Sequence, residues 1–277
     1  MRTFRRHAAM RKGEESGKEG IVRYFHVQFE SETLGGEGEF AVYLPAAQAD
    51  SYPVLWVLHG AFAQYSESFE NSSLCRYAEN RGMAIVAPSS YLGVYQDMVY
   101  GENGYSFVRE VFEKAPKLFT KLSLKPEENF LMGISMGGYG SFKLAMEFPE
   151  RFLGAAGFSS PVDMVFTMGL LEGGKHGGGH ELYDAFGSSE GLWGTVSDVI
   201  GMAEKNLAEG RKLPRLALCW GDSEMAGMED SRASGIFREL GIRIYTRIGH
   251  GGHSFDTWDA QIPKVLDYLM SGEEKED

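Results

Sequence analysis

Cysteine, basic charge and long apolar runs are all scarce in this sequence. Its two cysteines, Cys75 and Cys219, each lie in or beside an apolar stretch. This predicts two buried free thiols rather than a disulfide framework. No apolar run approaches the ~20 residues of a membrane-spanning helix. The first twenty residues also lack the apolar segment of a signal peptide, so we expect a cytoplasmic protein with a flexible leader over residues 1–20.

Basic residues are fewer than acidic residues in this sequence. The 27 Lys and Arg residues stand against 39 Asp and Glu residues, a net charge of −12. Such a surface repels nucleic-acid phosphates and anionic membranes, and we expect neither as a partner. Hydrophobic residues make up 43% and charged residues 24% of the 277 positions, an ordinary globular composition that excludes wholesale disorder. A homodimer is the commonest assembly in general.

Short apolar runs alternate with helix-like segments. Residues Ile21–Glu30 and Glu39–Leu44 predict an antiparallel hairpin. The later runs are apolar on both faces, as in the buried strands of a parallel sheet; they are Val54–Leu58, Met83–Ala87, Asn129–Gly133, Leu153–Phe158, Arg215–Trp220 and Ile242–Ile248. The predicted helices are Ser66–Asn80, Tyr105–Lys121, Met136–Phe148, Ser197–Glu209, Glu229–Leu240 and Asp256–Met270.

This alternation predicts one α/β domain over residues 21–277. Its central sheet is mostly parallel and flanked by helices, with an antiparallel hairpin at the N-terminal edge. Pro116 lies inside a predicted helix, so we expect a kink or a restart there.

A glycine-rich excursion interrupts the pattern at about residues 161–195. Its GGKHGGGH run, Gly173–His180, is costly to hold in regular structure. A lid and a plain surface loop are equally good interpretations. His176 and His180 have a zinc-like spacing but no third ligand at a standard distance, so we predict no metal and no other cofactor.

The sequence Gly133-Ile134-Ser135-Met136-Gly137 is a G-x-S-x-G motif between a predicted strand and a predicted helix. That context makes Ser135 a candidate nucleophile on a sharp strand-to-helix turn. Small neighbours let the backbone close the turn. The helix N-terminus leaves the Met136 N–H free to bind an oxyanion.

A serine nucleophile needs a base. His253 follows the last predicted strand, which delivers it to the same end of the sheet as Ser135; His250 is the fallback. The order serine, acid, histidine places the acid at the end of Arg215–Trp220. Two carboxylates, Asp222 and Glu224, are available there, and either type can orient an imidazole.

The second oxyanion donor is expected in the loop after His59-Gly60. The Ala61 N–H is the best candidate and the Phe62 N–H the next. We expect His59 to be structural, with its ring bonded beneath the loop. Asp230 is expected to be a helix-start carboxylate. The aromatic residues proposed to line an acyl pocket are Phe62, Tyr65, Trp193 and Trp258.

Together these motifs resemble a known family. The stretch GISMGGYGSFKLAMEFPERFLGAAGFSS is similar to the putative esterase family of α/β-hydrolases, which includes esterase D (S-formylglutathione hydrolase), tributyrin esterases, and acetyl-xylan and feruloyl esterases. VLHG, VAPSS, YGENGYSF, WGDSE and HSFDTW fall in matching order over roughly Ile21–Met270. The tributyrin-esterase branch is the most similar.

The resemblance implies the nucleophile at Ser135 and the histidine at His253. The family acid stands three residues after the glycine that ends its strand, which is Glu224 here. The family normally has Asp at this place, so the chain departs from its pattern; Asp222 keeps the residue type but not the spacing.

The expected activity is hydrolysis of short acyl esters by a serine carboxylesterase, through a Ser-His-acid triad and an acyl-enzyme, with a small-molecule substrate. Within enzymes, the alternatives are an S-formylglutathione hydrolase-like thioesterase and an acetyl or feruloyl sugar esterase. A catalytically silent hydrolase-fold protein that binds a ligand is the alternative of another class.

Overall fold

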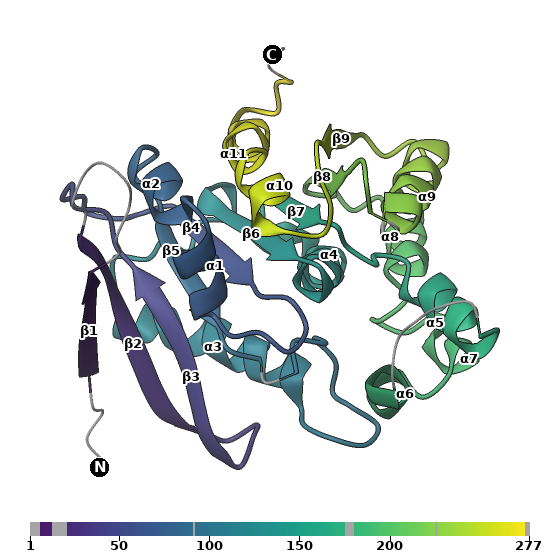
Figure 1. The fold of residues 1–277 in the computed structure, drawn as a ribbon, viewed down its shortest axis with the longest axis horizontal. Coiled ribbons are helices and arrows are strands. Elements are labelled where there is room, and N and C mark those ends of the chain that lie inside the picture. The colour runs from purple at the N-terminus through teal and green to yellow at the C-terminus, as the bar shows by residue number, and fades with distance from the viewer. Residues whose placement is uncertain (1–5, 13–20, 91, 175–179, 225–226, 275–277) are drawn as a thin grey trace.

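One nine-stranded sheet runs through the described part of the chain (Figure 1). The computed structural model describes residues 6–12, 21–90, 92–174, 180–224 and 227–274. The strands are β1 Arg6–Lys12, β2 Ile21–Ser31, β3 Gly36–Tyr43, β4 Val54–Leu58, β5 Ala84–Pro88, β6 Asn129–Ile134, β7 Gly154–Phe158, β8 Arg215–Gly221 and β9 Ile244–Gly249. Across the sheet their order is β1-β2-β3-β5-β4-β6-β7-β8-β9.

The six strands from β5 to β9 in this order pair in parallel. Every residue of β4, β5, β6 and β7 is buried, because helices cover both faces of the sheet. A strand buried on both faces must be apolar throughout. The prediction of a mostly parallel sheet from continuous apolar runs is therefore confirmed, with each run overlapping one strand.

The opposite edge of the sheet is antiparallel. Strands β2 and β3 form the expected hairpin, and β3 pairs antiparallel with β5. The expected flexible leader differs from the structure over Arg6–Lys12, where β1 pairs antiparallel with β2. An edge strand offers a row of unpaired backbone groups that a neighbouring segment can meet. The rest of the leader lies outside the described residues.

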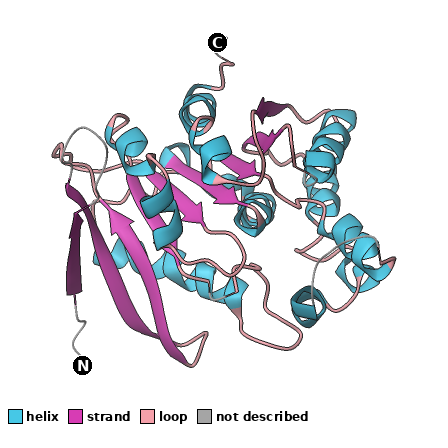
Figure 2. Cartoon of the chain, in the orientation of Figure 1, coloured by secondary structure: helices cyan, strands magenta, loops and turns pink. Residues whose placement is uncertain are grey.

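The helices follow the predicted segments with local breaks. In chain order they are α1 Ser66–Asn71, α2 Leu74–Glu79, α3 Gly104–Leu118, η1 Pro126–Glu128 (3₁₀), α4 Met136–Glu147, η2 Pro149–Arg151 (3₁₀), α5 Met164–Glu172, α6 His180–Phe186, α7 Ser189–Leu192, α8 Val199–Ala208, α9 Gly227–Glu239, α10 Phe255–Asp259 and α11 Ile262–Ser271. Helices α1, α2, α10 and α11 pack on one face of the sheet, and α3, α4, α8 and α9 pack on the other (Figure 2).

Two predicted helices are each divided in two. Between α1 and α2, the Ser72 hydroxyl bonds the Ser68 carbonyl and the Leu74 amide, which competes with the helical ladder. Between α10 and α11, the second helix begins at Ile262 with Pro263 in its first turn, where the missing N–H of proline is tolerated but cannot continue the hydrogen-bond ladder of α10. The restart expected at Pro116 is not seen, because this residue lies in the last turn of α3.

The glycine-rich excursion carries the short helices α5, α6 and α7, which group at one end of the molecule (Figure 1). Backbone amides of Val99 and Tyr100 donate to carbonyls of α6, at 3.2 and 2.8 Å. Residues 175–179 of the glycine run lie outside the described residues, and so does His176.

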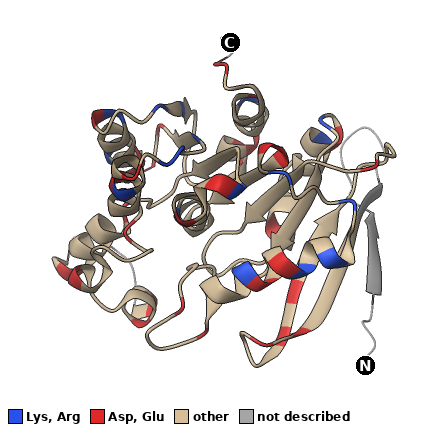
Figure 3. Cartoon of the chain, turned by 180° about the vertical axis from the view of Figure 1, so that it is seen from behind, with Lys and Arg blue, Asp and Glu red and all other residues tan. Residues whose placement is uncertain are grey.

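Charge is mixed over the face seen from behind in Figure 3, where basic and acidic residues alternate along α3. Lys114 and Glu110 form an ion pair there at 3.1 Å. Within the described ranges, no helix has both the length and the apolar character needed to cross a membrane.

Glycines let α4 approach the central strands closely. A Cβ on Gly133 would overlap the Gly137 carbonyl, and a Cβ on Gly137 would overlap the Leu58 carbonyl. The strand-to-helix turn at Ser135 is therefore packed directly against the end of β4.

We expect Gly137→Ala to lower the free energy of unfolding by about 1–3 kcal/mol, the usual cost of forcing atoms into a packed site. Gly235→Ala is the matched control, because Gly235 lies in α9 with open space at its Cβ position. It should be neutral or stabilising by up to about 1 kcal/mol. Urea unfolding of both variants measures the difference, and equal stabilities would contradict this account of the turn.

Candidate active site

The loops that follow β4, β6, β7, β8 and β9 meet at one edge of the sheet. These strands are consecutive neighbours and run in parallel, so their carboxyl ends lie together. In open parallel sheets this is the edge at which ligands bind. Each residue predicted to carry chemistry lies just after one of these five strands.

Ser135 occupies the turn between β6 and α4 in a strained conformation. Its φ is 54° and its ψ is −123°, a region that non-glycine residues rarely adopt. Its amide donates to the Phe158 carbonyl at 2.8 Å. Ser135 is partly exposed, whereas Ile134 and Met136 on either side are buried. The turn thus presents this serine at the surface, as a nucleophile elbow requires.

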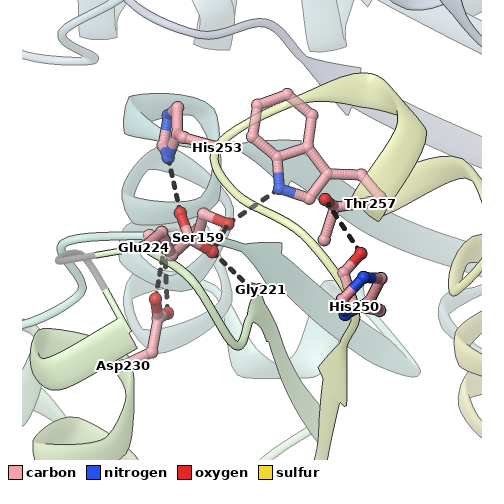
Figure 4. A network of polar contacts seen from close by, with 9 residues as sticks. Ser159, Gly221, Glu224, Asp230, His250, His253 and Thr257 are labelled. Atoms are coloured by element: carbon pink, nitrogen blue, oxygen red, sulfur yellow. Dashed lines mark hydrogen bonds and ion pairs between the residues drawn. The ribbon is translucent and has the colours of Figure 1, made fainter.

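The imidazole of His253 is paired with Glu224 (Figure 4). The distance from His253 Nδ1 to Glu224 Oε2 is 2.8 Å. The Glu224 side chain is 3% exposed and that of His253 is 44% exposed. A carboxylate opposite Nδ1 requires Nδ1 to carry the proton. This leaves Nε2 as an acceptor, the state that a general base needs.

Three donors meet the Glu224 carboxylate. Oε2 faces His253, while Oε1 accepts the Gly221 amide and the Ser159 hydroxyl, each at 2.5 Å (Figure 4). The Ser159 oxygen in turn accepts the indole N–H of Trp258 at 2.7 Å. A buried charge is tolerated only when hydrogen bonds or an opposite charge replace its contacts with water.

Asp222 points away from this group and pairs with His250 at 3.0 Å. The side chains are 46% and 96% exposed, respectively. The Gly251 amide, followed by the Ser223 hydroxyl and His250, lowers the pKa of Asp222 to about 2. The two carboxylates left open by sequence reasoning thus belong to two separate pairs, an inner one (His253–Glu224) and an outer one (His250–Asp222).

The loop after β4 lies against the nucleophile turn. A Cβ built on Gly60 would be 3.6 Å from the Cβ of Ser135. Of the two predicted oxyanion donors, the Phe62 amide donates to the Leu92 carbonyl at 3.1 Å. The Ala61 amide is therefore the better candidate on this side. Met136, the first residue of α4, carries the candidate donor on the other side.

His59 supports this loop from below. It is 1% exposed, and its Nδ1 donates to the Gly60 carbonyl at 2.7 Å. Burial lowers the pKa of His59 to about 4, so the ring is neutral near pH 7. The Tyr95 hydroxyl donates to the His59 carbonyl at 2.8 Å, and the buried Lys143 amine donates to the Tyr95 carbonyl at 3.0 Å. Burial lowers the pKa of Lys143 to about 7.

The predicted pocket aromatics have different environments. Phe62 is 67% exposed in the loop after β4. Trp258 is buried and uses its N–H on Ser159, and its ring packs edge-on against His253 at 4.9 Å; this position suits support of His253 rather than substrate contact. Tyr65 stacks on the His26 ring, and Trp193 is exposed after α7.

Ser159, whose hydroxyl contacts Glu224, was not predicted as a site residue. Ser160 donates its amide to the Asp230 carboxylate at 3.0 Å. Asp230 lies in the first turn of α9, as expected, but it is fully buried and its pKa is raised well above its ordinary value by burial. The sequence did offer one indication of these contacts, because two serines directly follow the apolar run that ends at Phe158. Among the described residues, no group of three or more His, Cys, Asp or Glu side chains is arranged to hold a metal ion.

Backbone strain is concentrated at the carboxyl ends of the parallel strands. Within the described ranges, the non-glycine residues with positive φ are Phe62, Tyr95, Ser135 and Ser159. Each costs on the order of 1–3 kcal/mol and persists only where the surroundings impose it. All four lie in or directly beneath the groups described above, which marks this edge as the functional one.

A strained serine after a parallel strand, with a histidine and a carboxylate from later strands, defines an α/β-hydrolase. The sequence model of the putative esterase family matches residues 31–269. The chain belongs to this family, and it is an enzyme that acts on ester bonds.

Individual relatives agree with this placement. An acetyl esterase of Caldicellulosiruptor saccharolyticus is 22% identical over 225 residues, which cover 80% of this chain and 84% of that protein. An S-formylglutathione hydrolase of Paracoccus denitrificans is 29% identical over 164 residues, 52% of this chain and 57% of that protein. The structure of a fluorophosphonate-binding serine hydrolase of Staphylococcus aureus has a TM-score of 0.80 at 23% identity, covering 90% and 98% of the two chains.

Protonation of His59 should make stability depend on pH. The unfolded chain protonates this imidazole near its ordinary value of 6.5, whereas the folded chain does so near 4. The free energy of unfolding should therefore fall as the pH is lowered from 6.5 to 4. This histidine alone should account for about 3 kcal/mol of that loss. His59→Asn should remove this part of the slope in urea unfolding measured from pH 7 to pH 4. An unchanged slope would contradict the buried, neutral histidine.

Proposed function

We propose that the chain is a serine carboxylesterase for short acyl esters, with Ser135, His253 and Glu224 as its catalytic triad. Ser135 Oγ attacks the ester carbonyl. His253 takes the serine proton at Nε2 and then gives it to the leaving alcohol, and Glu224 holds the imidazole tautomer and stabilises the imidazolium. Water cleaves the acyl-enzyme with the same histidine as base.

The observation that carries this proposal is the inner pair. Only one of the two histidines after β9, His253, is bonded to a side chain that is almost fully buried. A buried carboxylate holds an imidazole more rigidly than one in solvent, because the surroundings of Glu224 restrict its rotamer. The outer His250–Asp222 pair is exposed to solvent and screened.

The oxyanion of the tetrahedral intermediate is assigned to the amides of Met136 and Ala61. One belongs to the start of α4, where backbone N–H groups lack helical partners. The other belongs to the loop that β4 places beside Ser135. Donors fixed in this way stabilise charge that develops only in the transition state.

The substrate class rests on the relatives. The acetyl esterase match, which covers most of both proteins, favours small acyl groups on a small-molecule alcohol. The exposed ring of Phe62, next to Ala61 in the loop after β4, is assigned to the acyl pocket. The S-formylglutathione hydrolase match makes acyl-glutathione thioesters the second candidate substrate.

The two histidine–carboxylate pairs provide matched variants. Glu224→Ala and His253→Ala should lower kcat/KM for p-nitrophenyl acetate by roughly a thousandfold or more, the scale of a lost triad acid. Asp222→Ala and His250→Ala should stay within about threefold of the parent. If the outer-pair variants lose activity and the inner-pair variants keep it, His250 and Asp222 would be the base and the acid in place of His253 and Glu224.

Substrate preference is measured with the unmodified protein. On p-nitrophenyl esters from acetate to octanoate, kcat/KM should be highest for the short chains. The kcat/KM for these short esters should exceed that for an acyl-glutathione. A higher kcat/KM for the acyl-glutathione would indicate a dedicated thioesterase instead. Ser135→Ala is the blank, and equal rates for parent and blank on both substrate types would favour the silent-binder alternative.

A further inference from the structure

Ser159 carries a buried hydroxyl whose hydrogen bonds among the described residues run to Glu224 and Trp258. It directly follows β7, is 0% exposed, and has a φ of 52°. Its amide donates to the Cys219 carbonyl at 2.7 Å, which continues the pairing of β7 with β8 past the end of the strand. Its Oγ then lies 2.5 Å from Glu224 Oε1. The strained backbone thus turns this side chain toward the carboxylate.

The direction of the Ser159 proton follows from its two partners. Trp258 Nε1 can only donate, so the Ser159 oxygen accepts there, at 2.7 Å. The single hydroxyl proton is left for Glu224. Because His253 and the Gly221 amide also donate, each hydrogen-bond partner of this carboxylate among the described residues is a donor.

These hydrogen bonds restrain the longer side chain of a glutamate at the acid position. A glutamate has one more rotatable bond than an aspartate, so it needs an additional restraint to present one oxygen to an imidazole. Ser159 and Gly221 both hold Oε1, from the ends of the neighbouring strands β7 and β8, which leaves Oε2 for His253.

We propose that Ser159 is a positioning residue for the triad acid, with Trp258 fixing the direction of its hydroxyl. The role rests on the proposed function, since it acts only through Glu224. It differs from a packing role, because the hydroxyl proton itself is required. Trp258 connects the same network to His253, against whose ring it packs.

The first test is Ser159→Ala in the full chain, assayed on p-nitrophenyl acetate. We expect kcat to fall roughly ten- to a hundredfold, the scale of a lost hydrogen bond to a charged group, while KM changes less than about twofold. Ser160→Ala is the matched control, because its buried hydroxyl has no hydrogen-bond partner among the described residues. It should keep the parent kcat. Parent kcat in folded Ser159→Ala overturns the proposal.

A double-mutant cycle separates this role from a structural one. In a Glu224→Ala background, adding Ser159→Ala should change kcat by less than about twofold, because the group on which Ser159 acts is gone. A full, additive loss there overturns the proposal. If Glu224→Ala alone has parent activity, the proposed triad fails as well; if Glu224→Ala collapses and Ser159→Ala does not, the role of Ser159 alone fails.

Trp258→Phe provides a second variant that keeps an aromatic ring at this position and removes the N–H together with part of the indole. It should lower kcat about three- to tenfold and add nothing in the Ser159→Ala background. Urea unfolding of each variant establishes that it is folded in the assay. If Ser159→Ala does not fold, parent kcat in Trp258→Phe overturns the proposal.

Discussion

The organisation of this site depends on keeping one carboxylate charge, that of Glu224, away from water. The side chain is 3% exposed, and such a charge is destabilising unless hydrogen bonds replace its hydration. The donors come from the ends of three neighbouring strands: Ser159 after β7, Gly221 at the end of β8, and His253 after β9. Meeting this charge therefore sets the relative positions of three loops, and with them the position of the His253 imidazole.

The parallel sheet makes this convergence possible, and it also carries the strain. Ser135 and Ser159 both adopt positive φ at the ends of adjacent strands, and Phe62 and Tyr95 do so in the loops after β4 and β5. Strained turns of this kind persist only on a rigid base. The base here is a set of strands buried on both faces, together with buried polar supports such as His59 and Lys143.

Much of the fold was predictable, because a strand covered on both faces must be apolar along its whole length. The runs Val54–Leu58 and Asn129–Gly133 therefore marked β4 and β6 nearly to the residue. Strand β1 was not predictable in this way, because an edge strand is defined by the partner it meets rather than by a buried face. The break between α1 and α2 depends on where the Ser72 hydroxyl points, which periodicity does not record.

The site was predictable only in part, for a similar reason. Ser135 and His253 lie at positions that chain order and strand ends indicate. The two pairs could be told apart only from the path of the backbone after β8, where the Asp222 amide pairs with the last residue of β9 and the Ser223 amide with the loop after it. This path turns Asp222 outward to His250 and Glu224 inward. Ser159 was not predicted because its contact with Glu224 depends on β7 lying beside β8, which is a property of the sheet order.

The most direct test of this account is the proton spectrum of the folded protein in water. A proton held between an imidazole Nδ1 and a buried carboxylate resonates far downfield of the amide region and exchanges slowly enough to be seen. We predict such a signal in the parent and in Asp222→Asn, and its loss in Glu224→Gln and His253→Gln. A downfield signal that survives Glu224→Gln, or that disappears in Asp222→Asn, would show that Glu224 is not the carboxylate that holds the His253 imidazole.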